Sequence, residues 1–268
     1  AADRARARGG CSPEEGAAGI GLKPGTVTWP AVLQRAGWAT GLFGKWHLGM
    51  QPQFYPTRFG FDHFFGFVGN GAVPRNPKID FPDGQRSVPG WFPDLLVDDA
   101  LRFLAARRGQ PFALSLHFRE PHEPYGPMPA ADEAVFAGRP LTLPDLPGLD
   151  RAYVEKRTRA YLAATHAIDR NLGRVFDYLR QHGLWENTVV VFTSDHGYHL
   201  GHQLVEGKGN AAWIAGGIKG PRRPNLWDLS LRVPLLIRWP GVTRPGSVIP
   251  QQVSNIDFFA TLLAIAGV

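Results

Sequence analysis

Six side chains that suit the binding and chemistry of an anion occur in three short segments of the sequence. They are Lys45 and His47 in GLFGKWHLGM (41–50), His122 in HFREPHEPY (117–125), and Asp195, His196 and Lys208 in TSDHGYHLGHQLVEGKGN (193–210). Two ammonium groups, two imidazoles and a metal held by a carboxylate would together stabilise a tetrahedral oxyanion, and such charge stabilisation supplies most of this kind of catalysis. The combination predicts a site for a small tetrahedral anion.

The Asp-His-Gly sequence that begins at Asp195 ends an apolar run and is typical of a metal platform. Asp195 offers a hard oxygen ligand and His196 an imidazole nitrogen, while Gly197 lets the backbone turn away sharply. Two other interpretations stay open. In one, Asp195 only caps the following turn and His196 is a surface residue. In the other, His196, His199 and His202, spaced three residues apart, hold a zinc ion.

His122 stands between two prolines, which stiffen the loop that carries it. A neutral imidazole held in such a loop can act as general acid to a leaving group, and the alternative is a histidine satisfied by packing or water. His117 lies inside an apolar strand pattern and is expected to be structural. Glycines beside Lys45 and Lys208 permit close approach of backbone and substrate.

Alternating strand and helix patterns must position these segments. Strands are predicted at 38–44, 111–118, 188–195 and 233–241, and helices at 26–37, 94–110, 151–183 and 255–267. In the first helix, Thr28 is the expected N-cap and Gly37 the C′ residue. The alternating order of strands and helices indicates a layered α/β sheet, in which ligands bind beyond the carboxyl ends of strands. Segments 51–92 and 119–150 are interpreted as long functional loops.

Composition narrows the class of protein. The 268 residues are 44% hydrophobic with a net charge of +6, which fits a globular domain that binds a small anion. There is no basic stripe interleaved with aromatic residues and no nucleic-acid motif, so nucleic-acid binding is disfavoured. No run of eighteen apolar residues exists, so no transmembrane segment is predicted. The single cysteine, Cys11, excludes an internal disulfide.

Five segments resemble, in the same order, those of the sulfatase family of the alkaline-phosphatase-like superfamily: TVTWPAVLQRAGWATGLFGKWHLG, RFGFDHFFGF, PFALSLHFREPHEPY, NTVVVFTSDHGYHLG and SLRVPLLIRWPG. The resemblance extends from about residue 20 to the end. It implies an alkaline-phosphatase-like layered α/β/α domain with a mostly parallel, mixed central sheet. The Asp-His pair and the thirteen-residue step from Asp195 to Lys208 look most like the iduronate-type and choline-type branches.

The resemblance also implies a role for each residue of the motifs. Asp195 and His196 would be half of a Ca²⁺ site, with Mg²⁺ or Mn²⁺ as alternatives, and Lys208 would bind a sulfate oxygen. Lys45 and His47 would hold the hydroxyls of a formylglycine hydrate, the nucleophile, and His122 would stand near the bridging oxygen. The implied reaction is hydrolysis of a small sulfated substrate, a sugar sulfate or another sulfate ester, and the family prior favours an exported protein.

Two family elements are absent from the sequence: a first strand ending in paired aspartates, and the motif C-x-P-S-R or its serine version. Cys11-Ser12-Pro13 matches three positions of that motif, but Glu14 and Glu15 stand where Ser-Arg is expected. Cys11 is therefore not expected to be the nucleophile. We interpret residues 1–19 as a variable loop or leader and residues 20–268 as a partial catalytic domain, without front strand or C-terminal subdomain and inactive alone.

Two other functions stay open. A phosphonate or phosphate ester hydrolase of the same superfamily would share the fold and several motifs. A non-catalytic relative would keep the anion pocket without the nucleophile. Substrate specificity in either enzyme would come from the two long loops and from the insertion at 211–225.

Overall fold

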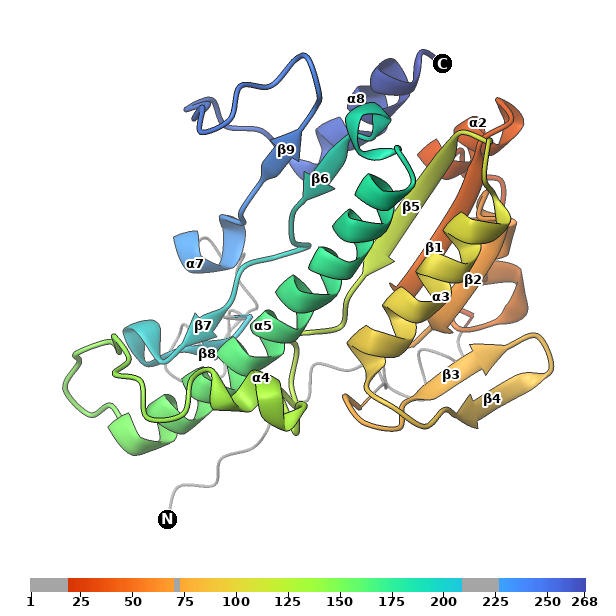
Figure 1. The fold of residues 1–268 in the computed structure, drawn as a ribbon. Helices are drawn as coiled ribbons and strands as arrows, with labels where there is room; N and C mark the ends of the chain where they lie inside the picture. The colour runs from red at the N-terminus through yellow and green to blue at the C-terminus, as the bar shows by residue number, and fades with distance from the viewer. Residues whose placement is uncertain (1–18, 70–72, 209–226) are drawn as a thin grey trace.

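The computed structural model describes residues 19–69, 73–208 and 227–268. Its main sheet has the strand order β4-β3-β2-β1-β5 (Figure 1). The strands are β1 (Ala39–Lys45), β2 (His63–Phe67), β3 (Lys78–Phe81), β4 (Gly84–Ser87) and β5 (Phe112–His117). β1 is parallel to both β2 and β5, whereas β3 and β4 add antiparallel. The predicted mixed, mostly parallel arrangement is confirmed at the centre of the sheet.

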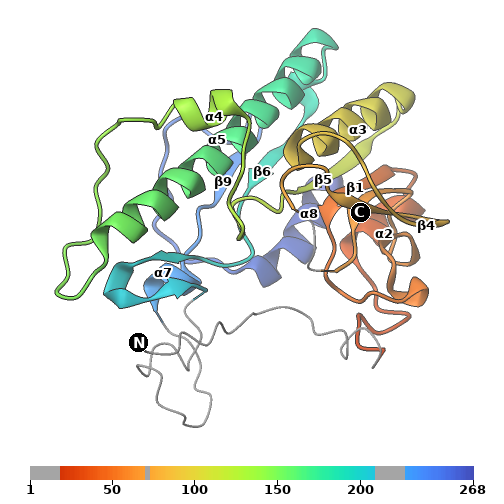
Figure 2. The ribbon, with the colours of Figure 1, turned by 90° about the horizontal axis from the view of Figure 1, so that it is seen from below.

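Helices cover both faces of this sheet. The helices of the described ranges are α2 (Trp29–Arg35), α3 (Phe92–Ala106), α4 (Ala130–Ala134), α5 (Arg151–Gln181), α7 (Asp228–Leu231) and α8 (Phe258–Ala266), of which α4 packs on α5 and α7 lies away from the main sheet. Figure 2 shows α3 and α5 on one side of the sheet and α2 and α8 on the other. The three layers are those of the expected α/β/α domain. No helix in the described ranges is both long enough and apolar enough to cross a membrane.

Capping residues explain where the main helices begin and end. The Thr28 side chain accepts a hydrogen bond from the Ala31 amide at 3.3 Å, and Gly37, just after α2, has a φ of +88°. The Asp150 carboxylate caps α5 in the same way, through the Tyr153 amide at 3.0 Å. The predicted N-cap and C′ residues of α2 are confirmed.

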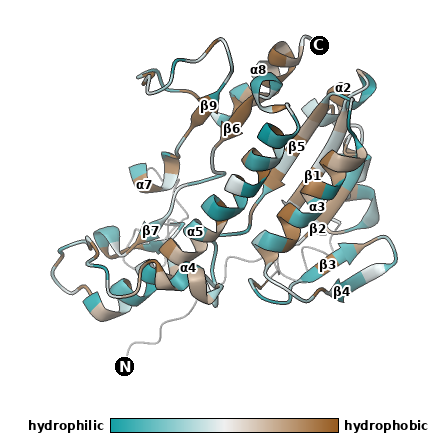
Figure 3. Cartoon of the chain, in the orientation of Figure 1, coloured by the Kyte–Doolittle hydropathy of each residue, from teal (hydrophilic) through white to brown (hydrophobic). Residues whose placement is uncertain are grey.

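The core follows from the alternation of side chains along β1. Leu42 and Phe43 are adjacent and both fully buried, because successive residues of a strand point to opposite faces. Phe43 joins a cluster with Phe92 of α3 and Val175 of α5, while Leu42 packs with Trp46 on the other face. Apolar residues accordingly gather on the strands, and the outer surface of α5 is hydrophilic (Figure 3).

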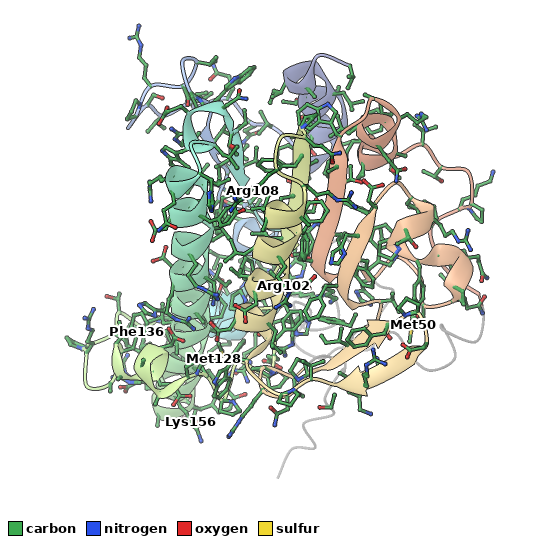
Figure 4. The ribbon with its side chains drawn as sticks, turned by 45° about the vertical axis from the view of Figure 1, so that its right-hand side comes forward. Met50, Arg102, Arg108, Met128, Phe136 and Lys156 are labelled. Atoms are coloured by element: carbon green, nitrogen blue, oxygen red, sulfur yellow. The ribbon has the colours of Figure 1, made fainter. Side chains whose placement is uncertain are left out.

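The prediction of a long loop over 51–92 is wrong. That segment contains β2, β3 and β4, three of the five strands of the main sheet. β2 is an aromatic run that pairs with β1. β3 alternates polar and apolar residues over only four positions, and the four residues of β4 are all exposed, so neither forms a strand pattern of ordinary length. The segment 119–150 adds only the short α4, whose neighbours Met128 and Phe136 pack against α5 (Figure 4).

Two small sheets lie outside the main one. β6 (Val190–Phe192) pairs with β9 (Leu236–Arg238), and β7 (His199–Leu200) pairs with β8 (Glu206–Gly207). β6 and β9 are shorter than the predicted strands at 188–195 and 233–241. Within the described ranges β5 pairs only with β1, so its other side is an open edge that faces the β6–β9 pair (Figures 1 and 2).

Candidate active site

The carboxyl ends of β1 and β5 bring Lys45 and His117 together. The imidazole Nδ1 of His117 lies 3.0 Å from the Lys45 carbonyl oxygen, and because a carbonyl only accepts, Nδ1 carries the proton. Gly44 permits this approach: its φ is +118°, and a Cβ there would lie 1.9 Å from the His117 carbonyl oxygen. His117, expected to be structural, therefore stands at the edge of the site.

His47 occupies a strained position just beyond β1. Its φ is +61°, in the left-handed region that costs a residue with a side chain about 1 kcal/mol or more. The His47 amide donates to the Val68 carbonyl at 3.0 Å, and the buried Trp46 indole donates to the Phe54 carbonyl at 2.7 Å. These bonds hold the turn so that His47 stays at the same end of the sheet as Lys45.

The loop after β5 fixes His122 by hydrogen bonds. The His122 amide donates to the Arg119 carbonyl at 2.9 Å, and the Arg119 guanidinium donates to the Pro124 carbonyl at 3.0 Å. Nδ1 of His122 lies 2.7 Å from the Glu123 carbonyl oxygen, so that nitrogen is the donor. In the neutral ring, Nε2 is left as a proton acceptor.

Positive groups from two other segments, and from its own loop, act on the His122 imidazole. Burial is the first cause that lowers the pKa of His122 to about 4, and the charges of Lys45, Arg119, Lys208 and His196 lower it further. Charges act on an imidazole over several ångströms, so these groups belong to the same region of the molecule. Lys45, His122, His196 and Lys208, four of the six predicted residues, therefore influence one another electrostatically.

Asp195 and His196 form a compact donor pair after β6. The Asp195 Oδ2 lies 3.4 Å from His196 Nε2, and Oδ1 accepts from the His196 amide at 3.0 Å. His196 Nδ1 donates to the Gly197 carbonyl at 2.9 Å, which leaves Nε2 of the neutral ring as a lone pair beside the carboxylate. Desolvation lowers the pKa of His117, while its hydrogen bond to the Lys45 carbonyl and the Asp195 charge oppose this change.

This pair fits half of a site for a hard cation. A carboxylate and an imidazole nitrogen with its tautomer fixed by a carbonyl are both usual metal ligands. Ca²⁺ takes six to eight ligands, mostly oxygens, so this pair supplies only part of such a site. Within the described ranges no group of three or more His, Cys, Asp or Glu side chains could hold a metal.

The alternative zinc site does not form. His199 is fully buried and its Nε2 lies 2.8 Å from the Ser230 hydroxyl, and the three imidazoles form no group in the described ranges that could hold a metal. Gly197 is needed for a reason other than the expected turn, since its φ is not positive. A Cβ there would lie 2.0 Å from the Leu229 carbonyl oxygen, so only glycine lets this segment approach α7.

A buried ion pair that the sequence interpretation missed lies beside His122. The side chains of Arg119 and Glu120 are 3% and 0% exposed, and Arg119 Nη1 lies 3.8 Å from Glu120 Oε1. Burial raises the pKa of Glu120 to about 7, against the opposing charge of Arg119. The signal was present in the sequence as Arg-Glu directly before Pro-His. Cys11 and the insertion at 211–225 lie outside the described residues.

Known proteins match this chain along its whole length. A sequence model of the Sulfatase family matches residues 3–268. The N-acetylgalactosamine-6-sulfatase of Mus musculus is 29% identical over 283 residues, covering 98% of this chain and 49% of that protein. The steryl-sulfatase of Rattus norvegicus is 29% identical, covering 92% of this chain and 52% of that protein. The chain spans about half the length of these relatives.

Solved structures confirm the layered α/β fold. yidJ from Bacteroides fragilis superposes with a TM-score of 0.75 at 26% identity, over 92% of this chain and 57% of that one. A protein solved with its substrate D-glucosamine-2-N,6-O-disulfate gives 0.71 at 24% identity, over 92% and 62%. The phosphonate monoester hydrolase SpPMH from Silicibacter pomeroyi gives 0.62 at 23% identity, over 93% and 59%. The last two show a shared fold alone.

Proposed function

Because the chain belongs to the sulfatase family, we propose that it forms part of the catalytic domain of a sulfuric ester hydrolase that cleaves sulfate monoesters. The observation that carries the proposal is that Lys45 and Lys208, from two other segments, act electrostatically on the partly buried His122 imidazole. A site that concentrates positive charge on one imidazole suits an anion that reacts beside that imidazole.

Lys45 and Lys208 would hold the non-bridging oxygens of the sulfate group. Lys45 is fixed at the end of a buried strand, and Lys208 follows Gly207, whose φ of +72° turns the chain at the end of β8. His47, held just beyond β1, would act with Lys45 on the hydroxyls of the nucleophile. The nucleophile, a formylglycine hydrate in this proposal, is not among the described residues.

His122 would deliver the proton that the leaving alcohol needs. Its Nε2 is an acceptor in the neutral ring, and with a pKa of about 4, set first by burial, the ring is neutral at pH 7. A sulfate group bound between Lys45 and Lys208 would offset their charges and raise that pKa. Substrate binding would thus favour protonation of Nε2. As the S–O bond breaks, its electron pair stays on the bridging oxygen, which takes the Nε2 proton.

Asp195 and His196 would hold the metal ion, with Ca²⁺ preferred and Mg²⁺ or Mn²⁺ as alternatives. When bound, the cation would neutralise negative charge on the nucleophile and on the sulfate oxygens. Asp195 is 81% exposed and His196 is 30% exposed, so an ion could reach both groups.

We further propose that one more strand lies between β5 and β6. The β5 edge is open in the described ranges, and Phe192, Leu236 and Ile237 on the β6–β9 pair are 37%, 64% and 39% exposed. A strand there would join the two sheets and cover apolar surface. If it ran parallel to β5, its carboxyl end would reach Lys45 and Asp195, where the remaining metal ligands and the nucleophile are needed.

The substrate would be a small sulfate ester, a sugar sulfate or another one. The names of the two curated relatives, an N-acetylgalactosamine-6-sulfatase and a steryl-sulfatase, support the sulfate group rather than one kind of alcohol. The fold shared with a phosphonate monoester hydrolase makes phosphonate and phosphate esters the second candidates.

A comparison of ester substrates tests the proposal. The full-length gene product, purified with Ca²⁺, should hydrolyse 4-nitrophenyl sulfate with a kcat/KM well above those for 4-nitrophenyl phosphate and a phenyl phosphonate ester. A preference for the phosphonate or phosphate ester would show that the protein is a phosphonate or phosphate ester hydrolase of the same superfamily instead. Binding of inorganic sulfate without turnover of any of the esters would favour the non-catalytic relative.

A further inference from the structure

Arg157, in the second turn of α5, contacts two segments that carry candidate site residues. Its guanidinium Nη2 donates to the Tyr125 hydroxyl at 3.0 Å and forms an ion pair with the Glu123 carboxylate. Its Nε lies 4.0 Å from the Glu206 Oε2. The side chain is 20% exposed, so these contacts are made in a largely dehydrated setting. One helix residue therefore reaches both the loop after β5 and the strand β8.

Four tyrosines extend these contacts. The Tyr125 hydroxyl donates to the Tyr198 hydroxyl at 2.9 Å, and the Tyr153 hydroxyl donates to Glu206 Oε2 at 3.1 Å. The Tyr161 ring packs against the rings of Tyr125 and Tyr198, with centroids 5.7 and 5.9 Å apart. We call Arg157 with Glu123, Glu206 and these tyrosines the Arg157 cluster.

Members of the cluster adjoin the candidate site residues in the sequence. Glu123 follows His122 directly, Tyr198 is two residues after His196, and Glu206 is two residues before Lys208. The cluster thus joins the segments that must be aligned if Lys208 and His196 are to face His122. A guanidinium suits such a junction because its planar fork offers several donors in fixed directions.

We propose that Arg157 is a positioning residue for the active site: it holds the His122 loop and the 196–208 segment in register with each other. The effect of Arg157 on catalysis, though not its structural role, depends on the function proposed above. Arg157 brings two carboxylates, Glu123 and Glu206, to one side of α5. Without the guanidinium these carboxylates would face each other uncompensated, and both segments would lose their common anchor.

Arg159, on the same helix, provides a matched control. It is 28% exposed, pairs with Glu155 at 2.6 Å within the helix, and donates to the Phe136 carbonyl. Neither Glu155 nor Phe136 adjoins a candidate site residue in the sequence. Arg157→Gln and Arg159→Gln therefore remove the same charge from neighbouring positions of one helix, with different consequences expected for the site.

Hydrogen exchange on the 268-residue chain tests the positioning claim without any requirement for activity. Arg157→Gln should speed amide exchange at least tenfold in both 119–126 and 196–208, with β1 and β2 unchanged. Arg159→Gln should leave these two segments as in the wild type. Exchange that rises equally everywhere, or in neither segment, would overturn the proposal. If Arg157→Gln does not fold, Arg157→Lys decides by the same criterion, because it keeps the charge and loses the fork.

Kinetics of the full-length gene product separate positioning from simple destabilisation. Arg157→Gln should raise KM for an aryl sulfate and lower kcat/KM at least tenfold at a temperature where the variant is fully folded, and Arg157→Lys should restore part of the loss. If Arg157→Gln left both KM and kcat/KM unchanged, Arg157 would not position groups that act in catalysis. If the wild-type protein has no sulfatase activity, the proposed function fails, while the exchange result still decides what Arg157 does.

Discussion

Replacing Lys45 by methionine should raise the pKa of His122. Lys45 is the first of the positive groups that lower this pKa, after burial itself. At pH 5.5 a histidine with the ordinary pKa of 6.5 is about nine-tenths protonated, whereas a pKa of about 4 leaves His122 only about 3% protonated. Because burial is the largest cause, Lys45→Met should recover less than half of the separation between 6.5 and about 4.

The measurement is a titration of the 268-residue chain labelled in its histidine rings, followed by NMR, with the His122 signal assigned from His122→Gln. Wild-type His122 should show almost no protonation between pH 8 and 5, and Lys45→Met should begin to titrate in that window. Lys156→Met removes a lysine from the outer side of α5 (Figure 4) and should leave the His122 titration unchanged.

Inorganic sulfate supplies the converse perturbation. An anion bound between Lys45 and Lys208 should raise the pKa of His122 and bind more tightly as the pH falls, because binding and proton uptake are linked. A wild-type His122 that titrates near 6.5, or equal effects of Lys45→Met and Lys156→Met, would refute the account of this site.

Three further results are expected. Glu120 has a folded-state pKa of about 7 against an ordinary 4.5, so the folded state keeps its proton to a higher pH than the unfolded state does. The free energy of unfolding should therefore fall as the pH rises from about 4.5 to about 7, by about 3 kcal/mol at most. Urea unfolding of Glu120→Gln should not show this decrease, and a difference from the wild type that is the same at every pH would contradict the prediction. Gly44→Ala should lower the free energy of unfolding by about 3 kcal/mol or more, because the new Cβ would meet a carbonyl oxygen of β5. Gly138 also has a positive φ, +68°, but has open space around it, so Gly138→Ala should lower the free energy of unfolding by only about 1 kcal/mol in the same assay. In calorimetric titrations the 268-residue chain should bind Ca²⁺ no more tightly than about 1 mM, because its described residues offer only the Asp195–His196 pair at this site. The full-length gene product should bind it far more tightly and lose this binding in Asp195→Asn, and tight binding by the 268-residue chain would contradict the assignment of half a site.

The sequence was most informative where local chemistry decides structure. Helix α2 lies where a capping threonine and a C′ glycine predicted it, and β1 and β5 lie where short apolar runs end in polar residues. The strands β2, β3 and β4 were all missed. β3 and β4 have only four residues each, β4 is exposed throughout, and the pairing of all three depends on neighbouring strands. The segment 51–92 therefore looked like a loop although it builds half of the main sheet.

The sequence predicted the residue types of the site but not the contacts that hold those residues in place. Lys45, His122, His196 and Lys208 stood out because of their chemistry, and the fold gathers them. The roles of His117 and Arg157 depend on contacts across 72 residues to Lys45 and 32 residues to Tyr125, which no local pattern encodes. Arg119 and Glu120 were overlooked because charged residues beside a proline usually face solvent, whereas here both are buried.

Sulfate ester hydrolysis by variants of the gathered residues tests the central claim most directly. In the full-length gene product with Ca²⁺, Lys45→Met, His122→Gln and Lys208→Met should each lower kcat/KM for 4-nitrophenyl sulfate at least a hundredfold, as expected when groups that stabilise charge or transfer a proton are removed. Lys156→Met should retain wild-type activity. Variants of the three gathered residues that hydrolyse the ester as fast as Lys156→Met would show that this cluster is not the active site.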